Sequence, residues 1–221
     1  MIENWPRTPG EAVDLQETLR HQVRTETPLT RQPRFVAGVD VAYPIAGQTV
    51  AGAVAVLDAA TLNVVEIATA TAPTAFEYVP GLLAFREIPV LLAALAKLSV
   101  RPDVFVCDGY GVAHPRRFGL ACHFGLLTDT PAFGVAKTSF IGTHGPVGPE
   151  RGDHTDLVDG GEIVGSVVRT RRNVKPVYVS AGHLIDQAGA RDLALRLTRE
   201  FRLPETTRAA DHACRAALKA D

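Results

Sequence analysis

Three carboxylates occupy positions where the sequence makes a charged side chain costly. Asp40 lies inside a valine-rich run, "VAGVDVAY", Asp108 ends the apolar run "VFVC", and Glu87 begins a mostly apolar stretch. A buried carboxylate without a partner is destabilising by several kcal/mol, so each acid needs an ionic partner or a cation. For any single acid an ordinary pairing is open: a helix cap for Asp108, or an ion pair with Arg86 or Arg34 for the others.

Taken together, the three acids indicate a site for a hard divalent cation. Asp40 and Asp108 fall in runs that read as strands able to lie side by side, and Glu87 falls in a helical stretch. Mg²⁺ is bound in proteins mainly through carboxylate and water oxygens. Such ions activate water and stabilise the leaving oxygen of a phosphodiester. The pattern therefore favours metal-assisted hydrolysis and leaves the number of metal ions open.

The other reactive side chains form no competing motif. The seven histidines include no H-E-x-x-H zinc pattern; His114 follows the "VFVCD" run in a loop, and His123 reads as a packed helix residue. Three widely spaced cysteines, Cys107, Cys122 and Cys214, indicate reduced thiols and neither a disulfide frame nor a zinc site. No nucleophile elbow, P-loop or dinucleotide fingerprint is present.

Composition sets the class of protein. The 221 residues predict one domain, 1–221, with 46% hydrophobic and 21% charged residues. Lys and Arg number 23 against 24 Asp and Glu, which does not support a protein coated in basic charge but allows a local basic patch for nucleic acid. The densest basic segment is 169–175, and it is either such a patch or a solvated turn. With no leader-like start and no apolar run long enough to span a bilayer, we expect a soluble, cytoplasmic monomer that does not bind membranes.

Periodicity predicts how the acids are positioned. Strands are predicted at 34–43, in a hairpin over 49–72 that turns at 58–61, and at 103–108, 132–137, 162–170 and 174–183. Helices are predicted at 11–27, through 91–98 with Pro89 in the first part, and at 117–127, 186–201 and 206–219, while 143–161 reads as a loop. This order predicts a single α/β domain with a mixed sheet of about six strands.

Seven motifs then resemble one family in order, from about residue 34 to 211. They are "VAGVDVAY", "YVPGLLAFRE", "DGYGVAHPRRFGLACHFGLL", "GVAKTSF", "DGGEIVGSVVRTR", "KPVYVSAGHLID" and "LPETTRAAD". This set resembles the endonuclease V family, the deoxyinosine 3′ endonucleases. The resemblance implies an RNase H-like fold with a mixed central β-sheet flanked by helices. It also implies Mg²⁺-dependent cleavage, with Mn²⁺ as a substitute, at the second phosphodiester bond 3′ of a deoxyinosine in DNA, as in DNA repair.

The resemblance also implies roles for individual residues. By match, Asp40, Glu87 and Asp108 bind the metal, and a further metal position falls on Asp211, with His212 adjacent to it. By match, Lys137 would approach the phosphate or the attacking water, and His114 would line the catalytic site; from the residues alone, Lys137 could also simply face solvent. Tyr78 matches the wedge tyrosine of the family's Pro-Tyr-Ile-Pro motif. Here Glu77 stands for the first proline, Pro80 is kept, and Tyr110 stands where the family has Gln or Asn.

A flipped base needs a pocket, and the sequence offers candidates for it. A weakly paired base such as inosine is the easiest to extrude from a duplex. Hypoxanthine presents O6 as an acceptor and N1–H as a donor, whereas adenine presents the reverse, so backbone N–H groups could select it. The candidates are Gly81, Leu83, Gly109, Gly111 and Leu120. As alternatives, the two leucines could belong to the core and the glycines to turns.

Other functions stay open at this level. Inosine-containing RNA is an alternative substrate, because these residues do not reveal whether a 2′-hydroxyl is required. A nucleic-acid-binding protein with a degenerate site is disfavoured by the intact Asp40, Glu87, Asp108 and Lys137. A small-molecule metallohydrolase would not need Tyr78 and its neighbouring proline. Activity on mismatches or abasic sites is not predicted in either direction.

Overall fold

The computed structural model describes residues 5–44 and 49–220. Residues 1–4, 45–48 and 221 lie outside the described residues, and they include both ends of the predicted domain, 1 and 221. The strands are β1 (Phe35–Ala42), β2 (Thr49–Asp58), β3 (Val64–Pro73), β4 (Val104–Asp108), β5 (Ala132–Ala136), β6 (His154–Asp159), β7 (Glu162–Val168) and β8 (Val177–His183). The helices are α1 (Pro9–Leu19), the 3-10 turn η1 (Arg20–Gln22), α2 (Leu83–Leu95), α3 (Leu120–Thr128), α4 (Gln187–Arg196) and α5 (Glu205–Ala220).

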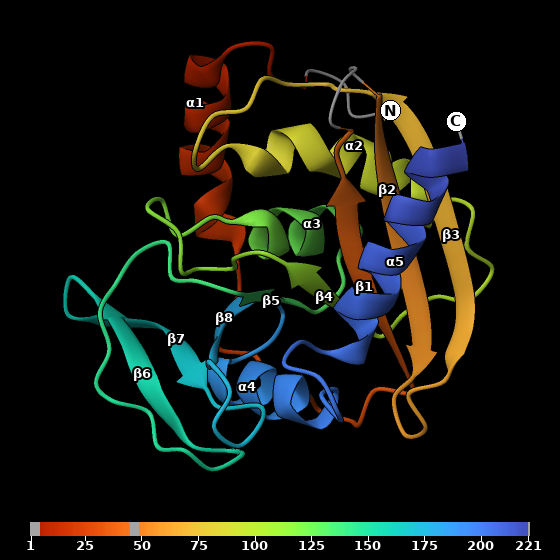
Figure 1. Cartoon of the computed structure of the whole chain (residues 1–221). Helices are drawn as coiled ribbons and strands as arrows, with labels where there is room; N and C mark the ends of the chain where they lie inside the picture. Colours follow the sequence, from red (N-terminus) through yellow and green to blue (C-terminus); the bar gives the residue numbers. More distant parts are fainter. Residues whose placement is uncertain (1–4, 45–48, 221) are drawn as a thin grey trace.

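The eight strands of the described residues belong to one mixed sheet, in the order β3-β2-β1-β4-β5-β8-β7-β6. β1, β4 and β5 are parallel, and the remaining pairs are antiparallel. Parallel neighbours need a crossover, and α2 and α3 supply the connections from β3 to β4 and from β4 to β5 (Figure 1). The ends of three parallel strands therefore meet at one edge, where the acids were predicted to gather.

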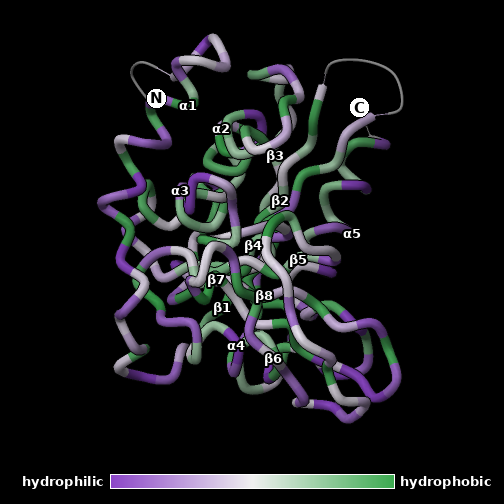
Figure 2. The backbone as a smooth tube through the Cα atoms, turned by 90° about the vertical axis from the view of Figure 1, so that its left-hand side faces the viewer, coloured by the Kyte–Doolittle hydropathy of each residue, from purple (hydrophilic) through white to green (hydrophobic). Residues whose placement is uncertain are grey.

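Helices cover both faces of the sheet. One hydrophobic cluster joins the strands to α4 and α5 through residues such as Leu193 and Ala210, and a second joins them to α2 and α3 through Leu91 and Phe124. In Figure 2 the hydrophobic colouring gathers on the central strands and on α2, while the hydrophilic colouring gathers in the loops. Together with the sheet order, this is the predicted α/β, RNase H-like arrangement.

Within the described residues the sheet has eight strands and not about six. The predicted segments account for seven of them, and β6 was predicted to be part of a loop. Its sequence "HTDLVD" carries two aspartates and a histidine, and Leu157 is the one fully buried position within it. β6 pairs antiparallel with β7 at the far edge of the sheet (Figure 1). An edge strand with one apolar contact has too little hydrophobic alternation to be distinguished from a loop.

Helix boundaries moved for identifiable reasons. α1 begins with a capping box between Thr8 and Glu11, but the helical segment ends near residue 22 and not at 27. Beyond it the chain is extended, and the carbonyl of Arg24 accepts a 2.7 Å hydrogen bond from the N–H of Leu184. α3 begins at Leu120 and not at 117, since Arg117 has a left-handed φ of 54°. These are tertiary and backbone effects that helix periodicity does not report.

α2 begins at Leu83, earlier than predicted, and continues through Pro89. A proline in a helix leaves the carbonyl four residues earlier without its usual donor. Here that carbonyl belongs to Phe85, and the indole N–H of Trp5 donates a 3.0 Å hydrogen bond to it. The N-terminal segment therefore satisfies the acceptor that Pro89 leaves open. Trp5 also stacks on His123, which is buried in α3 as expected.

Candidate active site

The register of two parallel strands brings the first two acids together. Val39 of β1 pairs with Cys107 of β4, so Asp40 lies beside Asp108 at the ends of adjacent strands. Side chains alternate along a strand, so both acids continue the rows of residues that pack towards α4 and α5. The pairing predicted from sequence is thus produced by strand register.

α5 brings Asp211 to the same edge. Its first turn presses on β1 at Gly38, where an added methyl group would lie 2.0 Å from the carbonyl oxygen of Thr206. Only glycine permits this approach, which places the following turn of α5 over the end of β1. Asp211 acts electrostatically on Asp40 and lines a hollow together with Asp40 and Asp108. Its carboxylate accepts a 2.7 Å hydrogen bond from the guanidinium of Arg215.

The fourth acid, Glu87, reaches the cluster from α2 on the other face of the sheet. Its side chain is 6% exposed and accepts a 3.0 Å hydrogen bond from the hydroxyl of Tyr43. The ring of Tyr43 lies under the guanidinium of Arg86, 4.8 Å from the ring centroid. We call Asp40, Glu87, Asp108 and Asp211 the acidic cluster.

Burial and mutual repulsion perturb two members of the acidic cluster. Burial, followed by the charge of Asp108, raises the pKa of Asp40 to about 7. Burial also raises the pKa of Glu87 to about 8, with the charges of Asp40 and Asp108 acting in the same direction and the Tyr43 hydroxyl opposing. Carboxyls that resist ionisation in this way gain most from a nearby cation.

Lys137 supplies one positive charge at the cluster, just beyond the end of β5. Its ammonium donates a 2.8 Å hydrogen bond to Oδ2 of Asp108. Burial opposes the charge on Lys137, but the hydrogen bond and the charge of Asp108 leave its pKa above the ordinary value. The guanidinium of Arg202 holds the main chain here, because it donates to the carbonyl of Lys137 at 2.5 Å.

The donor chemistry of the acidic cluster fits a divalent cation. Its members offer hard carboxylate oxygens, and burial together with repulsion between the acids raises the pKa of two of them. As placed, however, no three Asp, Glu, His or Cys side chains among the described residues converge closely enough to hold an ion. Each carboxylate is engaged by a different protein group: the Val41 N–H, Tyr43, Lys137 or Arg215.

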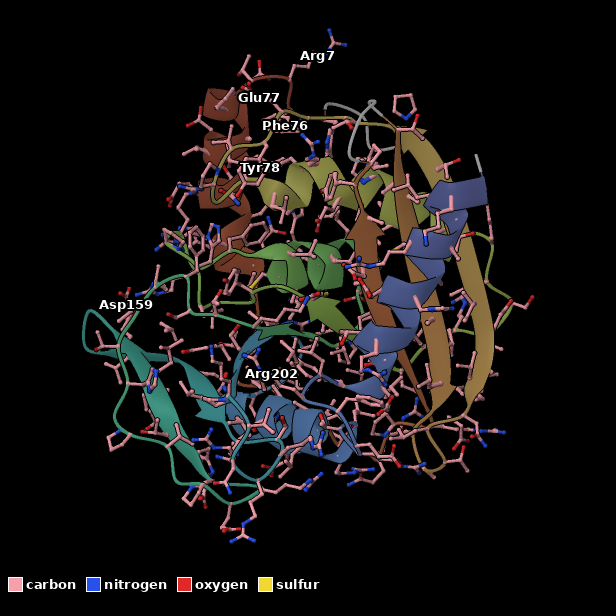
Figure 3. All side chains as sticks on the ribbon, in the orientation of Figure 1. Arg7, Phe76, Glu77, Tyr78, Asp159 and Arg202 are labelled. Atoms are coloured by element: carbon pink, nitrogen blue, oxygen red, sulfur yellow. The ribbon has the colours of Figure 1, made fainter. Side chains whose placement is uncertain are left out.

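Beside the cluster lies an apolar cavity of about 200 Å³. Seven residues predicted for the site line it: Tyr78, Pro80, Gly81, Leu83, Gly109, His114 and Leu120. Asp108 lines it as well, so the cavity and the acidic cluster share one carboxylate. Tyr78 lies at the rim and is 69% exposed, on the loop before α2 next to the exposed Glu77 (Figure 3). A larger hollow of about 870 Å³ beside α1 is lined by none of the predicted site residues.

Three donors fix the carbonyl of Gly81 on the wall of this cavity. It accepts hydrogen bonds from Nε2 of Gln16 at 3.0 Å, from Nε2 of His114 at 3.0 Å and from the guanidinium of Arg116 at 2.9 Å. Gly81 has a φ of 82°, and an added methyl group would lie 2.9 Å from the Arg116 guanidinium. A side chain is therefore disfavoured here by both conformation and space.

His114 lies in the wall of the cavity, and both of its ring nitrogens are engaged. A carbonyl can only accept, so Nε2 carries the proton towards Gly81, and Nδ1 accepts the N–H of Arg116 at 3.2 Å. Burial, then the charge of Arg116, lowers the pKa of His114 to about 4. At neutral pH the neutral ring holds the Gly81 loop, and this arrangement favours a positioning role over proton transfer.

The two glycines expected to donate to a base differ in placement. Gly109 lines the cavity, but its N–H donates to the carbonyl of Val135 at 3.3 Å. Gly111 lies outside the cavity lining, and its N–H donates to Oγ of Ser180 at 2.8 Å. A methyl group on Gly111 would lie 1.9 Å from the carbonyl oxygen of Ala181. These N–H groups are thus used inside the protein, and close packing explains the glycine at 111.

Several residues of the site carried no sequence signal. Gln16 is 1% exposed in a helix that read as a surface helix, and Tyr43 and Arg215 gave no pattern of their own. Tyr110, which sequence could not place, lines the cavity with Phe140; their ring centroids are 5.3 Å apart, and the Tyr110 hydroxyl donates to the carbonyl of Thr138. The contacts of Gln16, Tyr43 and Tyr110 join residues that lie far apart in the chain, whereas Arg215 contacts Asp211 within α5. The basic segment 169–175 lines neither the cavity nor the hollow beside Asp40.

Comparison with known proteins places these features in a family. The family model described as Endonuclease V matches residues 17–212. Endonuclease V of Nocardia farcinica is 54% identical over 97% of this chain and 95% of its own length. The crystal structure of Endonuclease V from Streptomyces avermitilis has 51% identity and a TM-score of 0.94, covering 98% of this chain and 96% of that one.

A structure with bound nucleic acid also matches. Endonuclease V of Ciona intestinalis, in complex with a 24mer DNA containing an inosine followed by a ribo-adenosine, has 29% identity and a TM-score of 0.84. The match covers 96% of this chain and 98% of that one. In this chain no helix among the described residues is both long enough and apolar enough to cross a membrane. By the match to its family model and the identity to its relatives, this chain belongs to the endonuclease V family.

Proposed function

We propose that this chain is a divalent-metal-dependent endonuclease that recognises deoxyinosine in DNA and hydrolyses the second phosphodiester bond on its 3′ side. The observation that carries the proposal is the sharing of Asp108 between the apolar cavity and the acidic cluster. If a base is held in the cavity, the backbone of the strand that carries it lies beside four carboxylates and one ammonium. Family membership supports the reaction class.

The acidic cluster is the proposed metal site. Asp40, Glu87, Asp108 and Asp211 would hold Mg²⁺, with Mn²⁺ as a substitute. When bound, the cation supplies an activated water and stabilises charge on the phosphodiester. Lys137 then orients the phosphate or the attacking water, because its ammonium already lies within hydrogen-bonding distance of Asp108.

The apolar cavity is the proposed site for the extruded base. Leu83 and Leu120 offer flat apolar contacts, and Gly109 allows the chain to pass close to a ring. The Gly81 carbonyl, held by Gln16, His114 and Arg116, keeps the loop that carries the wedge residue Tyr78 in place. Tyr78 would fill the gap that the base leaves, which its exposed position at the rim supports.

RNA containing inosine is the second candidate substrate. The Ciona intestinalis relative was crystallised with a DNA strand in which a ribonucleotide follows the inosine, and this supports testing both sugars at that position. A binding protein with a degenerate site is disfavoured, since all four acids and Lys137 are present: Asp40, Asp108 and Lys137 at strand ends, Glu87 on α2 and Asp211 on α5.

A cleavage assay tests the proposal. End-labelled strands carry a single deoxyinosine, a single inosine or adenine at the same position, and each is incubated with Mg²⁺, with Mn²⁺ or with EDTA. We expect a metal-dependent cut directly 3′ of the nucleotide that follows the lesion, with 3′-hydroxyl and 5′-phosphate ends, and an intact adenine strand. Absence of a metal-dependent cut near the lesion in both sugar types contradicts the proposal.

A further inference from the structure

A second hollow borders the acidic cluster at Asp108 and Asp211. This hollow, about 490 Å³ in volume, is the strand groove of the following paragraphs. It is lined by Asp108, Lys137, Phe201, Arg202, Leu203, Thr207, Arg208, Asp211, His212 and Arg215. Asp108 therefore lines both the apolar cavity and the strand groove. Tyr78 lines the apolar cavity and Arg202 lines the strand groove, and Figure 3 shows these two residues on well separated parts of the molecule.

Charge in the strand groove suits a phosphodiester backbone. Among the described residues lining it, the four cations Lys137, Arg202, Arg208 and Arg215 outnumber the two carboxylates Asp108 and Asp211. Lys137 and Arg215 pair with Asp108 and Asp211 of the acidic cluster, whereas Arg208 pairs with Glu205 and Arg202 donates to main-chain carbonyls. The cluster gains from a bound cation, and the excess of cations along the groove favours an anion. A polyanion whose reacting phosphate reaches the cluster would satisfy both.

One aromatic ring at the groove is poised for stacking. Phe201, in the connection between α4 and α5, is 45% exposed. The guanidinium of Arg208 lies 3.3 Å from its ring centroid, and Glu205 holds that guanidinium through a 2.6 Å hydrogen bond. An exposed phenylalanine alone would mean little. Here the ring is fixed by a neighbouring cation, lines a basic groove and lies next to the cluster.

We propose that Phe201, backed by Arg208, is a stacking platform for a nucleobase of the strand segment 3′ to the cut. The inference rests on the proposed function, which places the lesion in the apolar cavity and the cut on its 3′ side. If the strand enters at the cavity and passes the acidic cluster, the segment that continues beyond the cluster is the 3′ segment. Aromatic platforms beside cationic grooves bind single strands without sequence preference.

The competing exit lies past Tyr43, where Asp40, Arg215 and Lys219 line a hollow of about 730 Å³. The Tyr43 ring is already in use there, since its hydroxyl donates to Glu87 and its face contacts Arg86. The Phe201 ring contacts the guanidinium of Arg208, and 45% of the residue is exposed. The observations therefore favour the strand groove as the exit for the 3′ segment.

Fluorescence of 2-aminopurine tests stacking without requiring cleavage. The probe is placed at successive positions 3′ to the expected cut in a deoxyinosine strand, and binding is measured in EDTA. We expect quenching at one position by the parent protein, loss of quenching with Phe201→Ala and retention with Phe201→Trp. Ile163→Ala, which alters a 60% exposed side chain on β7, serves as the control and should quench as the parent does.

Cleavage in Mg²⁺ gives the second readout. Strands that extend several nucleotides beyond the cut should be cleaved roughly tenfold more efficiently than strands truncated there, and Phe201→Ala should remove that advantage. An abasic tail should give no advantage. The platform is overturned if Phe201→Ala quenches and cleaves as the parent does, or if an abasic tail works as well as a normal one. Quenching without any inosine-directed cleavage would instead contradict the proposed function and leave the platform standing.

Discussion

The ammonium of Lys137 lies 2.8 Å from Oδ2 of Asp108, so a strand-end cation is paired with the one carboxylate that borders both the apolar cavity and the strand groove. This pairing connects the end of β5 to the end of β4 across the parallel part of the sheet. It places positive charge where a phosphate oxygen would arrive, while half of the lysine side chain stays exposed to an incoming strand.

Lys137→Met should therefore lower cleavage without preventing folding. Removing one preorganised charge that acts on developing negative charge typically costs about 10²–10³-fold in rate. We expect a fall in kcat of that order on deoxyinosine strands, measured under single-turnover conditions, with lesion binding largely kept. Lys97→Met is the matched control, since Lys97 donates to the carbonyl of Thr69 on a remote surface and should leave kcat unchanged. An unchanged kcat for Lys137→Met would remove Lys137 from the site.

The acidic cluster predicts how metal and pH act on stability. Asp40 and Glu87 have folded-state pKa values of about 7 and 8, above those of the unfolded chain. Between the unfolded-state and the folded-state pKa values, from about pH 4 to about pH 8, the folded state binds more protons than the unfolded state. Stability therefore falls as pH rises through this window and levels off above it. Mg²⁺ bound at the cluster should offset that loss, so its effect on Tm should be larger at pH 8.5 than at pH 6.5.

Melting curves between about pH 6.5 and 9, with Mg²⁺ or EDTA, measure this effect. His114 and His123 have lowered pKa values of about 4 and 3, so their opposite contribution lies mainly below this range. Asp40→Asn should flatten the pH dependence in EDTA and reduce the stabilisation by Mg²⁺. Equal Mg²⁺ effects at both pH values, in the parent and in Asp40→Asn, would argue against a cation at the cluster.

The strand pattern and the order of motifs were enough to predict which residues gather at the candidate site. Contacts between residues far apart in the chain could not be predicted in this way. The sequence predicts that Asp40 and Asp108 lie close together, because each ends or interrupts an apolar strand. In the structure, the register of the parallel strands β1 and β4 places them side by side. The contact of Gln16 with Gly81 spans 65 residues, and nothing local in α1 marks the glutamine as buried. Likewise β6 owes its place in the sheet to pairing with β7 and not to its own hydrophobicity.

Tyr78 should act on lesion binding more than on the chemical step. Its ring lies at the rim of the apolar cavity and is 69% exposed, so removing it should cost little stability. Stacking on a base is worth about 1–3 kcal/mol, and Tyr78→Ala should weaken binding to deoxyinosine strands by a corresponding amount. Tyr78→Phe keeps the ring and should bind as the parent does. Titration by fluorescence anisotropy in EDTA measures both, and equal affinity for Tyr78→Ala would rule out the wedge role.

Gln16 should control how well the cavity is formed, although it lies on α1 and touches no acid of the cluster. Its amide donates to the carbonyls of Gly81 and Phe118, and its Oε1 accepts from Arg116. Gln16→Glu keeps the shape and the acceptor but loses both donor hydrogens, so the Phe118 carbonyl loses this partner and the Gly81 carbonyl keeps two of its three donors. Loss of a buried hydrogen-bond partner costs about 1–3 kcal/mol.

We expect Gln16→Glu to raise KM for deoxyinosine strands while kcat changes little, because the acidic cluster stays intact. The readout that separates this role from simple destabilisation is the ratio of cleavage on deoxyinosine and adenine strands, measured well below the Tm of the variant. Thr18→Ala provides the control, since Thr18 lies one half-turn further along α1 and bonds only within it, to the carbonyl of Asp14. If Gln16→Glu keeps the parent's KM and its preference for deoxyinosine, the Gly81 loop does not depend on this contact for its position.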